Sequence, residues 1–276
     1  MRNSAAALLD WYRISGVDEI THMHPANWFA QSQPGLTPEP ESATPPKIMS
    51  LRESLPVSDF EPQDRPQPIS VAGLSDAKAL AAKATTLDEL EASIRGFEGC
   101  ALKRTARNTV FADGNRKSKI LLIGEAPGEK EDAQGIPFCG PSGALLDKML
   151  GSIGLDRTKC LITNTIYWRP PGNRQPSPEE VLLCKPFVEK SIELVDPALI
   201  ILVGGTAAKT ILGTDQGISR LRGRKFTFTN PTGGKTHPAA LIFHPSYLLR
   251  QPAHKRLAWH DLLMIEQWLE DLKKQS

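Results

Sequence analysis

The sequence predicts an α/β fold in which helices cover both faces of a parallel sheet. Four short apolar runs alternate with segments of helical periodicity along residues 117–274. Each run is apolar at successive positions, which is typical of strands that are buried on both faces of a parallel sheet. The composition agrees, because 40% apolar and 23% charged residues are usual for a globular domain.

The expected elements follow one another in a regular order. Thr86 followed by Glu89 has the spacing of a capping box, and Ser177 followed by a proline is a typical helix start. We expect strands at residues 117–124, 159–168, 198–204 and 239–244, and helices at residues 75–84, 86–97, 142–154, 177–195, 206–213 and 253–274.

The N-terminal quarter has a different character. Residues 5–16 have the pattern of a short amphipathic helix, whereas residues 33–68 are rich in proline and poor in aromatic and β-branched residues. We therefore divide the chain into an N-terminal helix and proline-rich linker at residues 1–70 and an α/β domain at residues 71–276.

Composition excludes several classes of protein. No segment approaches the roughly 18 uninterrupted apolar residues of a membrane span, and Asp10 and Arg13 interrupt any secretory signal. We expect a cytoplasmic monomer that does not bind membranes. The net charge of +2 does not by itself indicate a nucleic-acid partner. The four cysteines form no Cys-x-x-Cys pair, so we expect neither zinc nor disulfides.

Polar motifs follow the apolar strands, where functional groups of α/β sheets gather. "GEAPGEKEDAQGIPFCGPSG" after the first strand contains Glu125, Glu129, Glu131 and Asp132. Carboxylates there suit activation of water or stabilisation of a cationic centre; a site for a hard cation is the alternative. "VGGTAAKT" after the third strand lacks the spacing of a phosphate-binding loop.

The motif "FHPSYLLR" follows the fourth strand. The proline fixes the backbone beside His244. An apolar residue followed by Arg250 suits a wedge between bases with an anchor on phosphate.

Taken together, "GEAPGEKED…IPFCGPSG", "ITN", "RPPGNR…P" and "HPSYLLR", in this order, resemble family four of the uracil-DNA glycosylase superfamily. The resemblance covers about Cys100 to Leu272. It implies a three-layer α/β/α fold with a central four-stranded parallel sheet, DNA containing uracil as partner, hydrolysis of the bond between uracil and deoxyribose, and no catalytic metal.

The resemblance also implies the roles of residues in the pocket. Phe138 matches the aromatic residue that stacks on the base, and Asn164 would read N3–H and O4 of uracil through its amide. His244 would donate to O2 of the departing base. Glu131 fits the acidic position best, with Glu125 second. The remaining residues beside the base would be Gly124, Ala126 and Gly128.

The same resemblance assigns the contacts with DNA. Leu248 would be the wedge that fills the space of the flipped base. The residues expected to hold the strand are Ser246, Arg250, Arg169, Arg174 and Arg222.

The first motif departs from the best-known branch of the superfamily, which has an aspartate at the place of Ala126 and a tyrosine at that of Gly128. Family four lacks both as well. Because the tyrosine excludes the methyl group of thymine, Gly128 leads to the hypothesis that some uracil derivatives are tolerated.

Family four ordinarily carries a four-iron, four-sulfur cluster held by four cysteines. Cys100 and Cys184 match two of these positions, but Phe97 and Trp168 stand at the other two. Because such a cluster needs four thiolates in one place, we expect no cluster and no other cofactor. We also expect the two aromatic rings to pack in the vacated volume.

Two alternatives to an enzyme remain. Some relatives are trapped covalently on the uracil site through a histidine in the loop after the second strand, but residues 169–178 contain no histidine. A partner-docking protein without catalysis is the other alternative, and the retained Asn164, His244, Phe138 and Glu131 argue against it.

Overall fold

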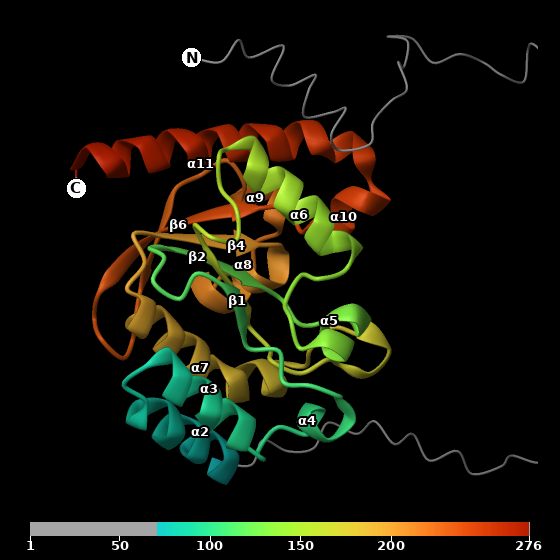
Figure 1. Cartoon of the computed structure of the whole chain (residues 1–276), viewed down its shortest axis with the longest axis vertical. Helices are drawn as coiled ribbons and strands as arrows, with labels where there is room; N and C mark the ends of the chain where they lie inside the picture. Colours follow the sequence, from blue (N-terminus) through green and yellow to red (C-terminus); the bar gives the residue numbers. More distant parts are fainter. Residues whose placement is uncertain (1–70, 276) are drawn as a thin grey trace, which may run out of the picture. The chain divides into compact units, whose positions relative to one another are not determined.

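Six strands form one mixed sheet in the computed structural model, which describes residues 71–275 (Figure 1). The predicted N-terminal helix and linker lie outside the described residues. The strand order is β1-β3-β2-β4-β6-β5. The strands are β1 (Ala112–Gly114), β2 (Ile120–Gly124), β3 (Leu161–Asn164), β4 (Leu199–Val203), β5 (Phe226–Thr229) and β6 (Thr236–Ile242).

The four inner strands are the parallel strands that the sequence predicts. β2 pairs with β3 on one side and with β4 on the other, and β4 pairs with β6. The edge strands β1 and β5 are antiparallel to their neighbours and were not predicted. Both are short, and neither has the apolar run that marks the inner strands.

The helices lie in two layers, one on each face of the sheet (Figure 1). One layer contains α2 (Val71–Lys83), α3 (Leu87–Gly96), α7 (Pro178–Val195) and α8 (Gly205–Leu212). The other contains α6 (Pro141–Ser152), α10 (Pro245–Arg250) and α11 (Lys255–Gln275). The three-layer arrangement is thereby confirmed. The shorter elements are α4 (Leu102–Thr105), α5 (Glu129–Gln134), η2 (Pro171–Asn173), α9 (Ile218–Leu221) and η3 (Pro252–His254).

Alternation along the strands explains why both faces are apolar. In β2, Leu121 and Ile123 join the core beneath α7, whereas Leu122 joins the core beneath α6 and α11. Successive side chains of a strand point to opposite faces. A strand between two helical layers therefore needs an apolar residue at every position.

The predicted helix starts are also found. The Thr86 side chain accepts a hydrogen bond from the backbone N–H of Glu89 at 3.2 Å. Ser177 and Glu180 cap α7 reciprocally, at 3.3 Å and 2.7 Å. Such caps satisfy backbone donors that the first helical turn leaves unpaired. Among the described helices, none has the length and apolar character that crossing a membrane requires.

The register of the parallel strands sets the position of the site. Gly124 at the end of β2 pairs with Asn164 at the end of β3. The segments that follow β2, β3, β4 and β6 therefore leave the sheet at the same edge. Beyond Asn164 the predicted strand stops, and residues 165–168 form a buried segment outside the sheet.

Candidate active site

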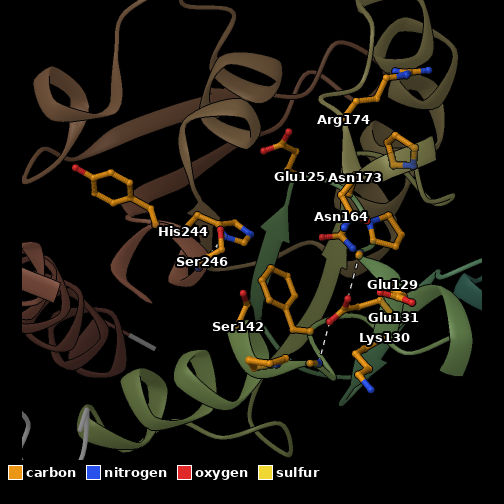
Figure 2. A pocket seen from close by; sticks show the side chains of 18 of the residues that line it. Glu125, Glu129, Lys130, Glu131, Ser142, Asn164, Asn173, Arg174, His244 and Ser246 are labelled. Carbon is orange, nitrogen blue, oxygen red and sulfur yellow. Dashed lines mark hydrogen bonds between the residues drawn. The ribbon is translucent and has the colours of Figure 1, made fainter. Parts of the chain in front are cut away.

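A cavity of about 610 Å³ lies at the carboxyl edge of the sheet (Figure 2). Most residues predicted for the site line it. They are Glu125, Ala126, Gly128, Glu131, Phe138, Asn164, Arg174, His244, Ser246 and Arg250. The cavity therefore brings together motifs that are up to 125 residues apart in the sequence, from Glu125 to Arg250.

Asn164 and Phe138 are buried residues that line this cavity. Asn164 is 1% exposed, and its Oδ1 has no hydrogen-bond partner among the described residues. Gly124 lets both side chains approach, because a Cβ there would lie 2.4 Å from Asn164 Oδ1 and 2.6 Å from Cζ of Phe138. An unpaired buried acceptor is costly, so this oxygen is suited to receive an N–H group of a ligand.

His244 faces the Phe138 ring, with 5.7 Å between the ring centroids. Its Nδ1 accepts the backbone N–H of Ser246 at 3.2 Å and lies 2.7 Å from Ser246 Oγ. Because an acceptor nitrogen carries no proton, the neutral ring is protonated on Nε2. Burial, and secondarily the charge of Arg250, lower the pKa of His244 to about 4, although Glu131 opposes this shift. At neutral pH the ring is therefore an uncharged donor.

The two candidate carboxylates have different surroundings. Glu131 Oε1 accepts the N–H of Gly140 at 2.9 Å, and its Oε2 accepts the N–H of Gly128 at 3.1 Å. It thereby joins the segments before α5 and α6. Burial raises the pKa of Glu125, while a hydrogen bond from the Thr206 side chain opposes that rise. Glu131 is thus fixed by two backbone amides, whereas burial makes the Glu125 carboxylate a stronger base than an exposed one.

The structure does not place Leu248 where a wedge must lie. Leu248 is 0% exposed and packs in the core beneath α6 and α11, whereas Leu249 is 46% exposed. Adjacent residues of a helix point about 100° apart, so α10 buries one leucine and presents the next. The motif alone left this orientation undetermined.

Arg222 does not have the free side chain that a phosphate contact needs. Its guanidinium forms an ion pair of 2.9 Å with Asp261, which is 0% exposed, and donates to the Leu257 carbonyl. It also lies over the Phe243 ring, 5.4 Å from the centroid. A buried carboxylate needs such a partner, so Arg222 supports the packing of α11.

The two arginines of the loop after β3 are held by Asn173 of the same loop and by Glu180 in the first turn of α7. Arg169 Nε donates to Asn173 Oδ1 at 2.7 Å, and Arg174 pairs with Glu180 at 2.7 Å. Asn173 lines the cavity and was not predicted. Its φ of 56° is left-handed, and the Gly-Asn pair in the "PPGNR" turn was the available signal. Tyr247 and Lys130 also line the cavity without having been predicted.

The four residues that stand at the positions of the family's cluster cysteines lie together in the core. Phe97, Cys100, Trp168 and Cys184 are each at most 2% exposed and lie in one core. The ring centroids of Phe97 and Trp168 are 6.4 Å apart, and the thiols of Cys100 and Cys184 belong to the same buried core. Two thiols and two aromatic rings do not fit an iron–sulfur cluster, which needs four thiolates. In residues 71–275 no group of three metal-ligating side chains is found.

Comparison with known proteins agrees with this geometry. Type-4 uracil-DNA glycosylase of Archaeoglobus fulgidus is 38% identical over 171 residues, which are 60% of this chain and 85% of the relative. The enzymes of the same name from Saccharolobus solfataricus and Thermotoga maritima are each 37% identical, over 58% and 61% of this chain and 78% and 87% of the relatives. The family model described as the uracil DNA glycosylase superfamily matches residues 111–263. The chain therefore belongs to the uracil-DNA glycosylase superfamily.

Proposed function

We propose that this protein is a uracil-DNA glycosylase, which flips uracil out of DNA and hydrolyses its N-glycosidic bond to leave an abasic site. The observation that carries the proposal is the buried Oδ1 of Asn164 in the cavity, which has no hydrogen-bond partner among the described residues. Uracil offers the N3–H that this oxygen lacks. Cytosine has no hydrogen on N3 and carries an amino group in place of O4, so it would leave the amide unsatisfied.

Base stacking and leaving-group stabilisation have separate residues. The Phe138 ring would stack on the flipped base, a contact worth about 1–3 kcal/mol. As the C1′–N1 bond breaks, its electron pair passes to the uracil ring and negative charge builds on O2. The Nε2–H of His244 would donate to O2 at that moment, when the contact lowers the barrier most.

The two carboxylates then divide the work on the sugar. Glu131, fixed by two backbone amides, would stabilise the positive charge that develops on the sugar. Glu125, whose pKa burial raises, would accept the proton of the water that attacks C1′. This division explains why both acidic residues lie in the first motif.

Contacts with DNA would come from the rim of the cavity. Leu249 is the exposed leucine of α10 and would fill the space of the flipped base. Arg250, Arg169 and Arg174 would hold phosphates, which gives a salt-sensitive contribution independent of sequence. Ser246, through its bond to His244, would orient the ring and face the same strand.

Tolerance of some uracil derivatives is part of the proposal. Among the described residues other than its chain neighbours, only Glu131 comes within 4 Å of a Cβ built at Gly128, with Oε2 2.8 Å away. The glycine therefore leaves room that a bulky side chain would take. We further propose that the protein works without an iron–sulfur cluster, because Phe97 and Trp168 fill two of the four ligand positions.

Excision measured on uracil in single-stranded DNA, opposite guanine and opposite adenine tests the proposal. The parent is compared with the His244→Ala, Glu131→Ala and Glu125→Gln variants. We expect an abasic product that alkali cleaves, and losses in all three variants on the order of 100-fold or more. A band of protein bound to DNA on a denaturing gel would instead indicate trapping, and unchanged rates would refute the site.

A further inference from the structure

Phe138 has a backbone conformation that aromatic residues seldom adopt. Its φ is 52°, in the left-handed region that favours glycine. Phe138 also lies in a segment without helix or strand, between α5 and α6. A strained conformation of this kind persists only where neighbouring groups fix it, and such sites are often functional.

The side chain of Arg157 binds the backbone on both sides of this strained position. Its Nη2 donates to the Phe138 carbonyl at 2.5 Å, and its Nη1 donates to the Pro137 carbonyl at 3.1 Å. Two successive carbonyls thus point toward one guanidinium. The planar fork of arginine can satisfy both at once, which a single ammonium group does less well.

Arg157 is itself held in place by carboxylates from two other elements. Nη1 pairs with Asp113 of β1 at 2.6 Å, and Nε pairs with Asp147 of α6 at 2.9 Å. The guanidinium is therefore oriented before any ligand arrives. Gly143 of α6 completes the support, because a Cβ there would lie 1.6 Å from the Phe138 carbonyl oxygen.

The ring of Phe138 depends on this backbone for its place in the cavity. It lies against Gly124 and faces His244 at 5.7 Å. If φ of Phe138 relaxed to a negative value, the Cα–Cβ bond would turn and move the ring away from Asn164. The site would then keep its polar groups but lose the surface on which a base stacks.

We infer that Arg157 is a positioning residue for base excision, which acts by holding Phe138 in the conformation that presents its ring to the flipped uracil. The inference rests on the proposed function. Arg157 does not line the cavity, so its effect on the reaction passes through Phe138. No local sequence pattern predicts this role.

A double-mutant cycle tests the inference. Arg157→Gln should lower kcat on single-stranded uracil DNA by on the order of 10- to 100-fold, the size of effect that a displaced binding group causes. It should also weaken inhibition by free uracil about tenfold, through loss of stacking. In a Phe138→Ala background, the same change should lower kcat less than about twofold, because coupled residues are not additive.

Arg116→Gln is the matched control, since Arg116 also pairs with two carboxylates, those of Asp88 and Glu91, away from the cavity. It should leave kcat and uracil inhibition unchanged. If Arg157→Gln does not fold, Arg157→Lys carries the same test, because it keeps the charge near Asp113 without the fork.

Equal losses from Arg157→Gln in the parent and in the Phe138→Ala background would overturn the inference while leaving the proposed function intact. Unchanged kcat in Arg157→Gln would do the same. A parent protein that releases no uracil would overturn both.

Discussion

Replacement of Trp168 by alanine should destabilise the fold strongly while leaving the chemistry of each folded molecule intact. Trp168 is 1% exposed, its ring packs on Phe97 and Tyr167, and its indole N–H donates to Thr109 Oγ1 at 3.0 Å. Truncation of a buried tryptophan costs about 3–5 kcal/mol. The buried Thr109 hydroxyl would also lose its partner, which adds about 1 kcal/mol.

The assay is urea unfolding of Trp168→Ala beside the parent, with excision measured at low temperature on the folded fraction. In a thermal melt of the same two proteins, a loss of about 4–6 kcal/mol should lower the melting temperature by about 8–24 °C, at ~2–4 °C per kcal/mol for a domain of this size. Trp268→Ala is the matched control, because Trp268 is only partly buried at the edge of the other core and should cost less than about 2 kcal/mol. A loss below about 1 kcal/mol for Trp168→Ala would refute its role as the residue that fills the vacated ligand position.

Three further predictions follow from the same geometry. Leu249→Ala should slow excision from duplex DNA by about tenfold or more without loss of stability. Leu248→Ala should instead lower the free energy of unfolding by about 2–5 kcal/mol. The reverse pattern would show that Leu248, and not Leu249, fills the space of the flipped base. The folded pKa of His244 lies below its unfolded value, so its contribution to stability is full above pH 6.5 and is lost as the pH falls toward about 4. A plot of kcat against pH should accordingly show no inflection from His244 near pH 6.5. If kcat instead falls below about pH 6.5 in the parent and this fall is absent in His244→Gln, His244 is not a neutral donor at neutral pH. Iron and sulfide analysis should find no cluster in the parent protein. The double variant Phe97→Cys, Trp168→Cys should place four thiols together, as a cluster requires. A brown parent protein with stoichiometric iron would contradict the prediction that no cluster is bound.

The four inner strands could be predicted from the sequence because an apolar run marks each of them. β2 and β4 are apolar at every position, since helices cover both of their faces. The edge strands β1 and β5 carry no such run. β1 has only three residues, and its pairing with β3 is set by the neighbouring strand more than by its own side chains. Tertiary context decides such strands.

The pocket was predictable where a motif names the residue and unpredictable where orientation decides the role. Asn164 ends β3, and Phe138 and His244 lie in the segments after β2 and β6, so all three meet at the carboxyl edge of the sheet. The motif does not say which of two adjacent leucines α10 presents to solvent. The sequence around Arg222 likewise does not show that its side chain binds Asp261, because that partner is 39 residues away.

Arg157 illustrates the same limit for residues that act through others. Its two carbonyl partners lie 19 and 20 residues earlier, and its carboxylate partners come from β1 and α6. No local pattern joins these positions. The link between Arg157 and the strained φ of Phe138 becomes visible only in the three-dimensional structure.

Single-turnover release of the base from single-stranded DNA, by the parent and by Asn164→Ala, tests the central claim most directly. The parent should release uracil but not cytosine. Asn164→Ala should release uracil about 100-fold or more slowly while unfolding at nearly the same urea concentration. The supporting comparison is Asn173→Ala, which removes an amide from the rim of the same cavity and should cost less. Release of uracil by Asn164→Ala at the parent rate, or release of cytosine as fast as uracil by the parent, would contradict the account.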